Sequence, residues 1–278
     1  MQVYSSIAAL RAGRRSFTEK LGLVPTMGFL HEGHLSLVRR ARAECHTVAV
    51  SIFVNPTQFA ADEDLDRYPR ALERDLDLLQ KEGVAFVFTP TPQEMYPPGF
   101  ATSIDVGPVA QPLEGALRPG HFAGVATVVT KLFNIVQPTH AYFGQKDAQQ
   151  CAVIRHMVRD LDIPVQIVIG DIVRSADGLA LSSRNAYLNE TERSRAVMLS
   201  TALSAASTKI AAGERDPARL RAIIRDTLAR EPALVVDYVS IADPLTMQEL
   251  DHLIDGAVVS LAVRVGTTRL LDNCVIQF

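Results

Sequence analysis

Short apolar runs alternate with helical patterns over the first 170 residues of the chain. Buried strands are predicted where apolar residues cluster between turn-forming residues, at 21–25, 46–54, 85–88, 140–144 and 165–169. Helices are predicted between them, through Leu35 to Cys45, near 67–82, at 122–136 and near 147–160. Strands that alternate with helices in this way predict a parallel, doubly wound, Rossmann-like α/β sheet.

The pattern changes after about residue 175. A long Ala-rich helical segment and a second helix are followed by three strand-like runs, at 189–212, 217–230, 235–242, 257–263 and 269–276. Helices followed by clustered strands predict a small α+β unit. We therefore expect a nucleotide-binding domain at 1–175 and a smaller C-terminal lid domain at 176–278, with the turn signal Asp177-Gly178 near their border.

Composition supports an ordered globular protein and narrows its partners. The 278 residues are 47 % apolar and 21 % charged, with a formal net charge of −3 and no long basic run, which argues against a nucleic-acid partner. Cys45, Cys151 and Cys274 are odd in number and lack metal-type spacing, so we expect reduced core residues. With no long apolar run and no apolar leader segment, we expect no membrane partner and a cytoplasmic location.

Two histidines follow the first strand and open the first helix. In an open α/β sheet, ligands bind beyond the carboxyl ends of the strands, where His31 and His34 are expected. Free backbone N–H groups at a helix start favour anions, so this pair suits a phosphate. In the alternative, the two histidines cap the helix and are solvated. The HEGH segment taken alone favours this alternative.

Further polar residues follow other predicted strands. Asn55 and Gln58 lie in FVNPTQF, and Lys146 and Gln150 lie in YFGQKDAQQ. Lys146 is one of five lysines among 28 basic residues, and a lysine can hold a phosphate as a point charge, unless it is a solvated surface residue. A third stretch, SSR at 182–184, supplies two hydroxyls and a guanidinium, unless it is a plain cap of the following helix. Together these stretches indicate one site at the sheet edge.

These segments and several others together resemble a known family. The segments HEGH, VNPTQF, YPR, RPGHFAGV, YFGQKDAQQ, DGLALSSRN and TRLLDN are similar to those of pantothenate synthetases (pantoate–β-alanine ligases), within the HIGH nucleotidyltransferase superfamily, from about residue 20 onward. The resemblance implies that ATP activates pantoate as a pantoyl-adenylate, which β-alanine then attacks. It also implies Mg²⁺ with ATP as co-substrate, release of pyrophosphate and AMP, and a homodimer.

The resemblance also assigns residues, in three groups. The ATP-binding residues that it implies are Met27, Gly28, Phe29, Leu30, His31, Glu32, Gly33, His34, Gly144, Gln145, Lys146, Asp147, Val173, Leu181, Ser182, Ser183 and Arg184. Of these, His31, His34, Lys146 and Arg184 are the catalytic candidates, with the acid role on His34. The resemblance places pantoate at Gln58 and Gln150, with β-alanine near Gln58. From the residues themselves, Asn55 is a further substrate candidate, and Arg118 and His121 of RPGHFAG are candidates for the β-alanine carboxylate, unless that loop is only stabilised by an ordinary cap. The metal ligands stay open: Asp75 follows Arg74 where some relatives carry adjacent acids, and phosphates and water often hold Mg²⁺.

Three other functions compete with a ligase. A nucleotidylyltransferase of the same superfamily shares the histidines but has no need for Gln58 and Gln150, whose neutral amides suit a carboxylate or hydroxyl. A tRNA-charging enzyme needs a basic RNA-binding surface, which the net charge argues against. A non-catalytic ATP sensor has no reason to keep both His34 and Lys146.

Overall fold

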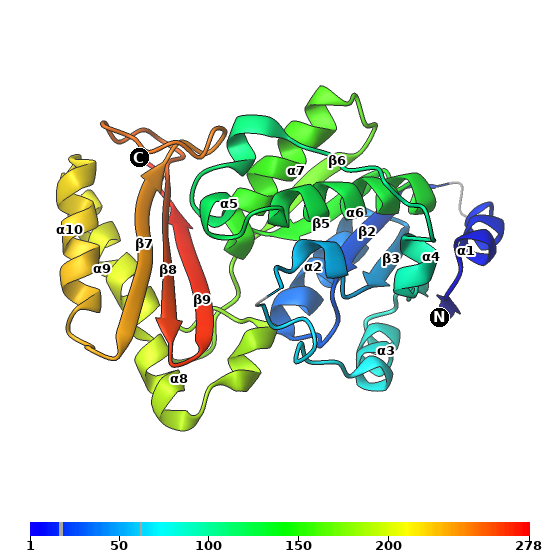
Figure 1. Ribbon diagram of the computed structural model, residues 1–278, viewed down its shortest axis with the longest axis horizontal. Coiled ribbons are helices and arrows are strands. Elements are labelled where there is room, and N and C mark those ends of the chain that lie inside the picture. Colours follow the sequence, from blue (N-terminus) through cyan, green and yellow to red (C-terminus); the bar gives the residue numbers. More distant parts are fainter. Residues whose placement is uncertain (17–18, 62) are drawn as a thin grey trace.

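The computed structural model describes residues 1–16, 19–61 and 63–278, and it contains two sheets that lie side by side (Figure 1). The first is six-stranded and entirely parallel, in the order β1-β4-β3-β2-β5-β6. Its strands are β1 (Gln2–Tyr4), β2 (Leu21–Thr26), β3 (Thr47–Ile52), β4 (Phe86–Phe88), β5 (His140–Gly144) and β6 (Gln166–Gly170). Its helices are α1 (Ile7–Arg14), α2 (Glu32–Glu44), α3 (Leu72–Lys81), α4 (Pro92–Met95), α5 (Glu114–Leu117), α6 (His121–Val136) and α7 (Ala148–Asp160).

The order of the parallel strands determines where a ligand can enter. Strands β2, β3 and β4 follow one another toward one edge, and the chain then returns to place β5 and β6 on the other side of β2. The direction of strand addition therefore reverses between β2 and β5, and such a switch point opens a crevice at the carboxyl ends of the strands. The prediction of a doubly wound parallel sheet is confirmed.

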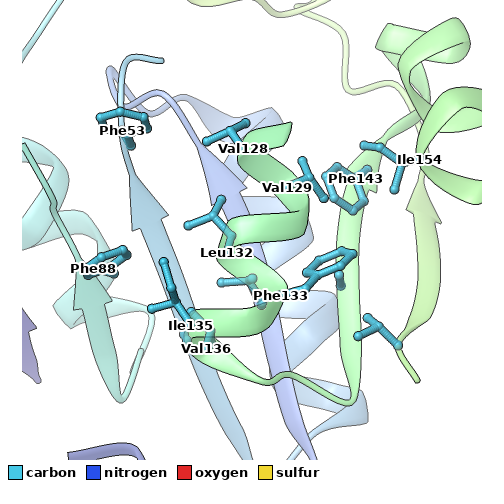
Figure 2. Close-up of a cluster of buried hydrophobic side chains, with 14 of the residues drawn as sticks. Phe53, Phe88, Val128, Val129, Leu132, Phe133, Ile135, Val136, Phe143 and Ile154 are labelled. Atoms are coloured by element: carbon cyan, nitrogen blue, oxygen red, sulfur yellow. The ribbon is translucent and has the colours of Figure 1, made fainter. Parts of the chain in front are cut away.

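Helices cover both faces of this sheet. On one face, α2 and α3 contribute Val38, Ala41 and Leu79 to a buried cluster with Val24 and Val50. On the other face, α6 packs against the sheet, and Figure 2 shows its Val128, Leu132 and Phe133 beside Phe88 and Phe143 from β4 and β5. Because α1 and α7 also pack against α6, this helix is apolar on most sides.

The second sheet carries its own layer of helices. It is antiparallel in the order β7-β8-β9, and Figure 1 shows α9 and α10 on one face of it. Its elements are α8 (Glu190–Ala196), α9 (Met198–Ala211), α10 (Pro217–Leu228), β7 (Leu234–Ala242), β8 (Val258–Val265) and β9 (Thr268–Val275). A small C-terminal α+β unit is therefore confirmed, whereas the domain boundary at residue 175 stays a prediction.

Some element predictions were wrong in detail. The segment 189–212 forms two helices that meet at Val197 rather than one. Helix α3 begins at Leu72 and not near 67, because Pro69 disfavours helical backbone at the residue before it. The short edge strand β1 and α1 were not predicted, since β1 is three residues long and α1 buries little besides Leu10.

Two of the three cysteines lie in the core, as expected. All three cysteines are free; Cys45 and Cys151 are buried, and Cys274 is half-buried. Within the described part of the chain, no helix combines the length and apolar character needed to span a lipid bilayer.

Candidate active site

A cavity of about 740 Å³ lies beyond the carboxyl ends of β2, β3 and β5. Its walls come from the loops after these strands, from the segment 181–187 and from β9 of the C-terminal sheet. The switch point of the parallel sheet therefore opens into a chamber that the C-terminal part helps to enclose. A cavity of this size can hold a nucleotide together with a small acid.

His31 and His34 line this cavity and also cap α2. His31 is the N-cap residue, and its Nδ1 accepts the backbone N–H of Gly33 at 3.2 Å. His34 is at position N3, and its Nδ1 accepts the backbone N–H of His31 at 3.3 Å. The two ring centroids are 4.1 Å apart. The two histidines therefore cap the helix, as the alternative expected, but they line the cavity rather than being solvated, and their contact with a phosphate stays a prediction.

The capping bonds determine how the two rings are protonated. A ring nitrogen that accepts a backbone N–H carries no proton, so each neutral imidazole presents Nε2–H as its donor. Burial lowers the pKa of His31 to about 4, with the nearby Lys146 charge adding to the shift. Burial likewise lowers the pKa of His34 to about 3, helped by His31. Near neutral pH, both histidines are uncharged hydrogen-bond donors.

Asp75 shapes the loop that leads into α2. Its carboxylate accepts the backbone N–H groups of Phe29 at 2.7 Å and Leu30 at 2.8 Å. Phe29 has φ of 50°, which is unfavourable for a residue with a side chain, and Gly28 has φ of 83°. The side chain of Asp75 is 1 % exposed and does not line the cavity. The structure therefore assigns Asp75 to loop support, whereas metal binding stays an untested prediction.

Asn55 orients Gln58 toward the cavity. The Oδ1 atom of Asn55 accepts the Thr57 backbone N–H, and its Nδ2 donates to the Gly124 carbonyl at 3.2 Å. The same Nδ2 donates to Gln58 Oε1 at 3.1 Å. Because the Gln58 oxygen is already bonded and its Nε2 contacts the weakly accepting Met27 Sδ at 3.3 Å, the NH₂ group can donate to a ligand. Asn55 is 1 % exposed, so in this structure it supports Gln58 from behind.

Arg118 and His121 hold the backbone of Gln58. His121 Nδ1 lies 2.8 Å from the Gln58 carbonyl oxygen, and Arg118 Nη1 lies 3.1 Å from His121 Nε2. Arginine can only donate, so His121 carries its proton on Nδ1 and donates it to Gln58. Burial lowers the pKa of His121 to about 4. Arg118 also makes a two-bond ion pair with Glu63, at 2.5 and 2.7 Å.

Lys146 lies on a 3₁₀ turn, η3 (Gln145–Asp147), between β5 and α7. Its Nζ is 3.3 Å from Asp147 Oδ1, and its side chain is 20 % exposed and lines the cavity. Gln150, on the first turn of α7, also lines the cavity. The Lys146 charge therefore faces the same chamber as the histidine pair across the switch point.

Arg184 reaches the cavity from the C-terminal part of the chain. It lies on the 3₁₀ turn η4 (Ser183–Tyr187), where the side chain of Ser182 caps the turn. The guanidinium makes a two-bond ion pair with Asp64, at 2.8 and 2.9 Å. Ser183 Oγ donates to the Phe29 carbonyl at 3.3 Å. The segment 182–184 is thus bonded to loops of the parallel-sheet part, which brings it over the cavity.

The predicted site residues fall into two groups. Those that line the cavity are Met27, His31, Gly33, His34, Asn55, Gln58, Arg118, His121, Gly144, Lys146, Asp147, Gln150, Val173, Leu181, Ser182, Ser183 and Arg184. Those that do not line it are Gly28, Phe29, Leu30, Glu32 and Gln145. Ligand contact stays a prediction for both groups, and the contacts that we find for these five residues are with other parts of the protein. Glu32, for example, pairs with Arg39 on the surface.

Several lining residues were missed from the sequence. Glu63 and Asp64 pair with the two site arginines, and Tyr68 lies under Arg184, whose Cζ is 5.6 Å from the ring centroid. Arg269 lines the far wall. The YPR and TRLLDN segments contain Tyr68 and Arg269, so the family motifs held a signal for both. Glu63 and Asp64 lie outside these motifs, and no sequence pattern indicates that they pair with arginines far along the chain.

Electrostatic features of the cavity favour a phosphate-bearing ligand over a metal cluster. Among the described residues, no three His, Cys, Asp or Glu side chains gather closely enough to hold a metal ion. The cavity instead combines Lys146, two neutral imidazole donors, a helix N-terminus and the Gln58 amide. Such donors suit phosphate oxygens and an uncharged or carboxylate-bearing co-ligand.

Comparison with known proteins gives a consistent result. A family model described as pantoate-beta-alanine ligase matches residues 2–275. A pantothenate synthetase of Roseiflexus castenholzii is 59 % identical over 277 residues, covering 100 % of both chains. The pantothenate synthetase of Heliobacterium modesticaldum is 53 % identical over 280 residues, again covering 100 % of both.

Solved structures agree with the sequence relatives. A pantothenate synthetase of Thermus thermophilus superposes with a TM-score of 0.96 at 48 % identity, covering 100 % of both chains. A pantoate-beta-alanine ligase of Francisella tularensis, complexed with beta-gamma ATP and beta-alanine, superposes with a TM-score of 0.81 at 34 % identity, covering 99 % of this chain and 97 % of that one. Since the family model spans nearly the whole chain and close relatives match it from end to end, the chain belongs to the pantoate–β-alanine ligase family of enzymes.

Proposed function

We propose that the protein joins pantoate to β-alanine at the expense of ATP, through a pantoyl-adenylate, and releases pyrophosphate and AMP. The observation that carries the proposal is that one cavity holds two kinds of donor. Lys146 and the neutral His31–His34 pair suit the phosphates, while the Gln58 NH₂ group suits a small acid. Neither a phosphate site alone nor an acid site alone accounts for both.

In the first half-reaction, the pantoate carboxylate attacks the α-phosphorus of ATP, and pyrophosphate leaves. Negative charge on the transferred phosphoryl group and the leaving group must be stabilised during this step. Lys146 supplies a positive charge, and His31 and His34 supply Nε2–H donors. Because burial keeps both rings neutral, His34 acts here as a hydrogen-bond donor rather than as an imidazolium.

The two glutamines suit the nucleophile. A carboxylate paired with arginine is stabilised in its ground state and loses reactivity, whereas a neutral amide orients it at smaller cost. Gln58 is held in place through both its side chain and its backbone, so its NH₂ direction is fixed before a ligand binds. Gln150 lines the same cavity from the first turn of α7. We assign pantoate to these two side chains.

We expect Mg²⁺ to enter with ATP, held chiefly by phosphates and water. The described side chains form no cluster for a bare ion, and Asp75 already accepts two backbone N–H groups. The ion would neutralise phosphate charge when bound. Its presence is an expectation from the family, and Lys146 and the histidines are this chain's own contribution to the same task.

Arg184 must exchange partners to reach a phosphate. Its guanidinium is paired with Asp64 in this structure, so contact with ATP requires that the phosphates replace or join this carboxylate. Burial would by itself raise the pKa of Asp64, but the bonds from Arg184 outweigh it and lower that pKa. We propose that the segment 176–188 and the C-terminal domain act as the lid over ATP, shielding the adenylate from water.

In the second half-reaction, the β-alanine amine attacks the acyl carbon of the adenylate and AMP leaves. Arg118 is the candidate for the β-alanine carboxylate, although in this structure it is paired with Glu63. We further propose a homodimer, as the family resemblance implies, and the molar mass in solution tests it. A cytoplasmic location remains our expectation from the sequence pattern.

Isotope exchange between pyrophosphate and ATP tests the proposed order of chemistry. We expect exchange with pantoate present and β-alanine absent, because the adenylate forms before the amine is needed. Exchange that depends on β-alanine alone would reverse the order of steps. Release of pyrophosphate without pantothenate when both acids are supplied would instead favour a nucleotidylyltransferase.

A further inference from the structure

The TRLLDN segment contributes a residue that reaches the turn carrying Lys146. Asn273 lies on β9 of the C-terminal sheet and is 2 % exposed. Its Nδ2 donates to the carbonyl oxygens of Gln145 at 3.0 Å and Lys146 at 2.8 Å. Its Oδ1 accepts Gln145 Nε2 at 3.1 Å. All three of these side-chain bonds go to the same turn, 127 or 128 residues away along the chain.

Asn273 is itself held rigidly. Its backbone N–H donates to Asp272 Oδ1 at 2.8 Å, and Asp272 is clamped by two bonds from Arg174, at 2.6 and 2.8 Å. Arg174 Nη2 also lies 3.4 Å from the Asn273 carbonyl oxygen. Asp272 is 2 % exposed, and a buried two-bond ion pair with further hydrogen bonds has a fixed geometry. A connected set of hydrogen bonds therefore links Arg174, through Asp272 and Asn273 on β9, to the turn that carries Lys146.

We infer that Asn273 is a positioning residue for Lys146, placed on the other sheet. The NH₂ group of Asn273 donates to the carbonyl oxygens of Gln145 and Lys146. These two bonds fix the peptide groups on either side of the Lys146 Cα and therefore the direction of its side chain. A flexible lysine needs such support, since a displacement of about 1 Å at a catalytic group costs on the order of 10²-fold in rate. In this inference, the C-terminal domain supports the turn that carries Lys146, in addition to its proposed role as a lid over ATP.

This inference rests on the proposed role of Lys146, so the test is a double-mutant cycle. Pyrophosphate exchange is measured at saturating ATP and pantoate for the parent protein, Asn273→Ala, Lys146→Ala and the double variant. We expect Lys146→Ala to lose about 10²- to 10³-fold, as removal of one preorganised donor does. Asn273→Ala is expected to lose about 10- to 100-fold in the parent and less than about twofold in the Lys146→Ala background.

The pantoate KM distinguishes positioning from general damage, and we expect Asn273→Ala to change it less than about twofold while the rate falls. Val263→Ala, a buried substitution on β8 that touches neither the turn nor the cavity, is the matched control and should leave the exchange rate near the parent value. If Asn273→Ala does not fold, the same cycle is run with Asn273→Ser, which fills more of the space but cannot reach both carbonyls.

Equal losses from Asn273→Ala in both backgrounds would overturn the inference, because a general structural role acts whether or not the lysine is present. Asn273→Ala with the parent rate would also overturn it. A parent-like rate for Lys146→Ala alone would instead remove the proposed role of Lys146, so the two failures are distinguishable.

Discussion

Substituting Asp75 by alanine separates loop support from metal binding. The carboxylate accepts the N–H groups of Phe29 and Leu30 and holds Phe29 at φ of 50° next to the histidine pair. Hydrogen bonds to a charged group contribute about 1.5–3 kcal/mol each, which puts an upper limit of about 3–6 kcal/mol on the pair. Burial raises the pKa of Asp75, so part of this gain is offset by the cost of burying the charge.

A net loss of about 2–4 kcal/mol in the free energy of unfolding is therefore expected for Asp75→Ala, with two amides left unpaired. At about 2–4 °C per kcal/mol for a chain of this size, Tm should fall by roughly 4–16 °C. Activity should fall as well, because the freed loop no longer presents His31 and His34 in one arrangement. The matched control is Asp77→Ala, which removes an exposed carboxylate from the same helix.

Magnesium titration decides between the two roles. If Asp75 supports the loop, the activity of Asp75→Ala stays equally low at every Mg²⁺ concentration, and the loss accompanies the fall in Tm. If Asp75 binds the ion, excess Mg²⁺ restores much of the activity and Tm changes by no more than about 2 °C, as for a surface substitution. The second result would refute the loop-support role of Asp75.

Steady-state kinetics should separate the charge supplied by Lys146 from the orientation supplied by Gln58. Lys146→Ala should raise the activation free energy by about 2.7–4 kcal/mol, which lowers kcat, with little change in pantoate KM. A variant that changes only KM would make Lys146 a ground-state binding residue. Gln58→Ala should instead worsen both constants, and an effect confined to kcat would argue against its contact with pantoate. The depressed pKa values of His31 and His34 mean that the unfolded chain binds more protons between about pH 4 and 6.5, so stability should fall as pH decreases through this window. Denaturant titrations of His34→Gln should show a shallower dependence of stability on pH there; an unchanged dependence would contradict the neutral buried pair.

The amino-acid sequence by itself determined the parallel sheet and the edge of it at which the candidate site lies. Apolar runs alternating with helical patterns predict a doubly wound sheet, and such a sheet brings the carboxyl ends of its strands to one edge. His34 after β2, Gln58 after β3 and Lys146 after β5 therefore had to come together. The position of each residue directly after a strand was enough to predict this, because a parallel sheet brings the carboxyl ends of its strands to one edge.

Only the tertiary structure decided how these groups are held and protonated. Arg184 and Asp64 are 120 residues apart, and Asn273 and Lys146 are 127 apart, so no local pattern joins them. The neutral state of His34 follows from its burial, and Asp75, a metal candidate by sequence, proved to hold the loop after β2. Periodicity reports which face of an element is buried, whereas the partner of a polar group depends on which elements pack together.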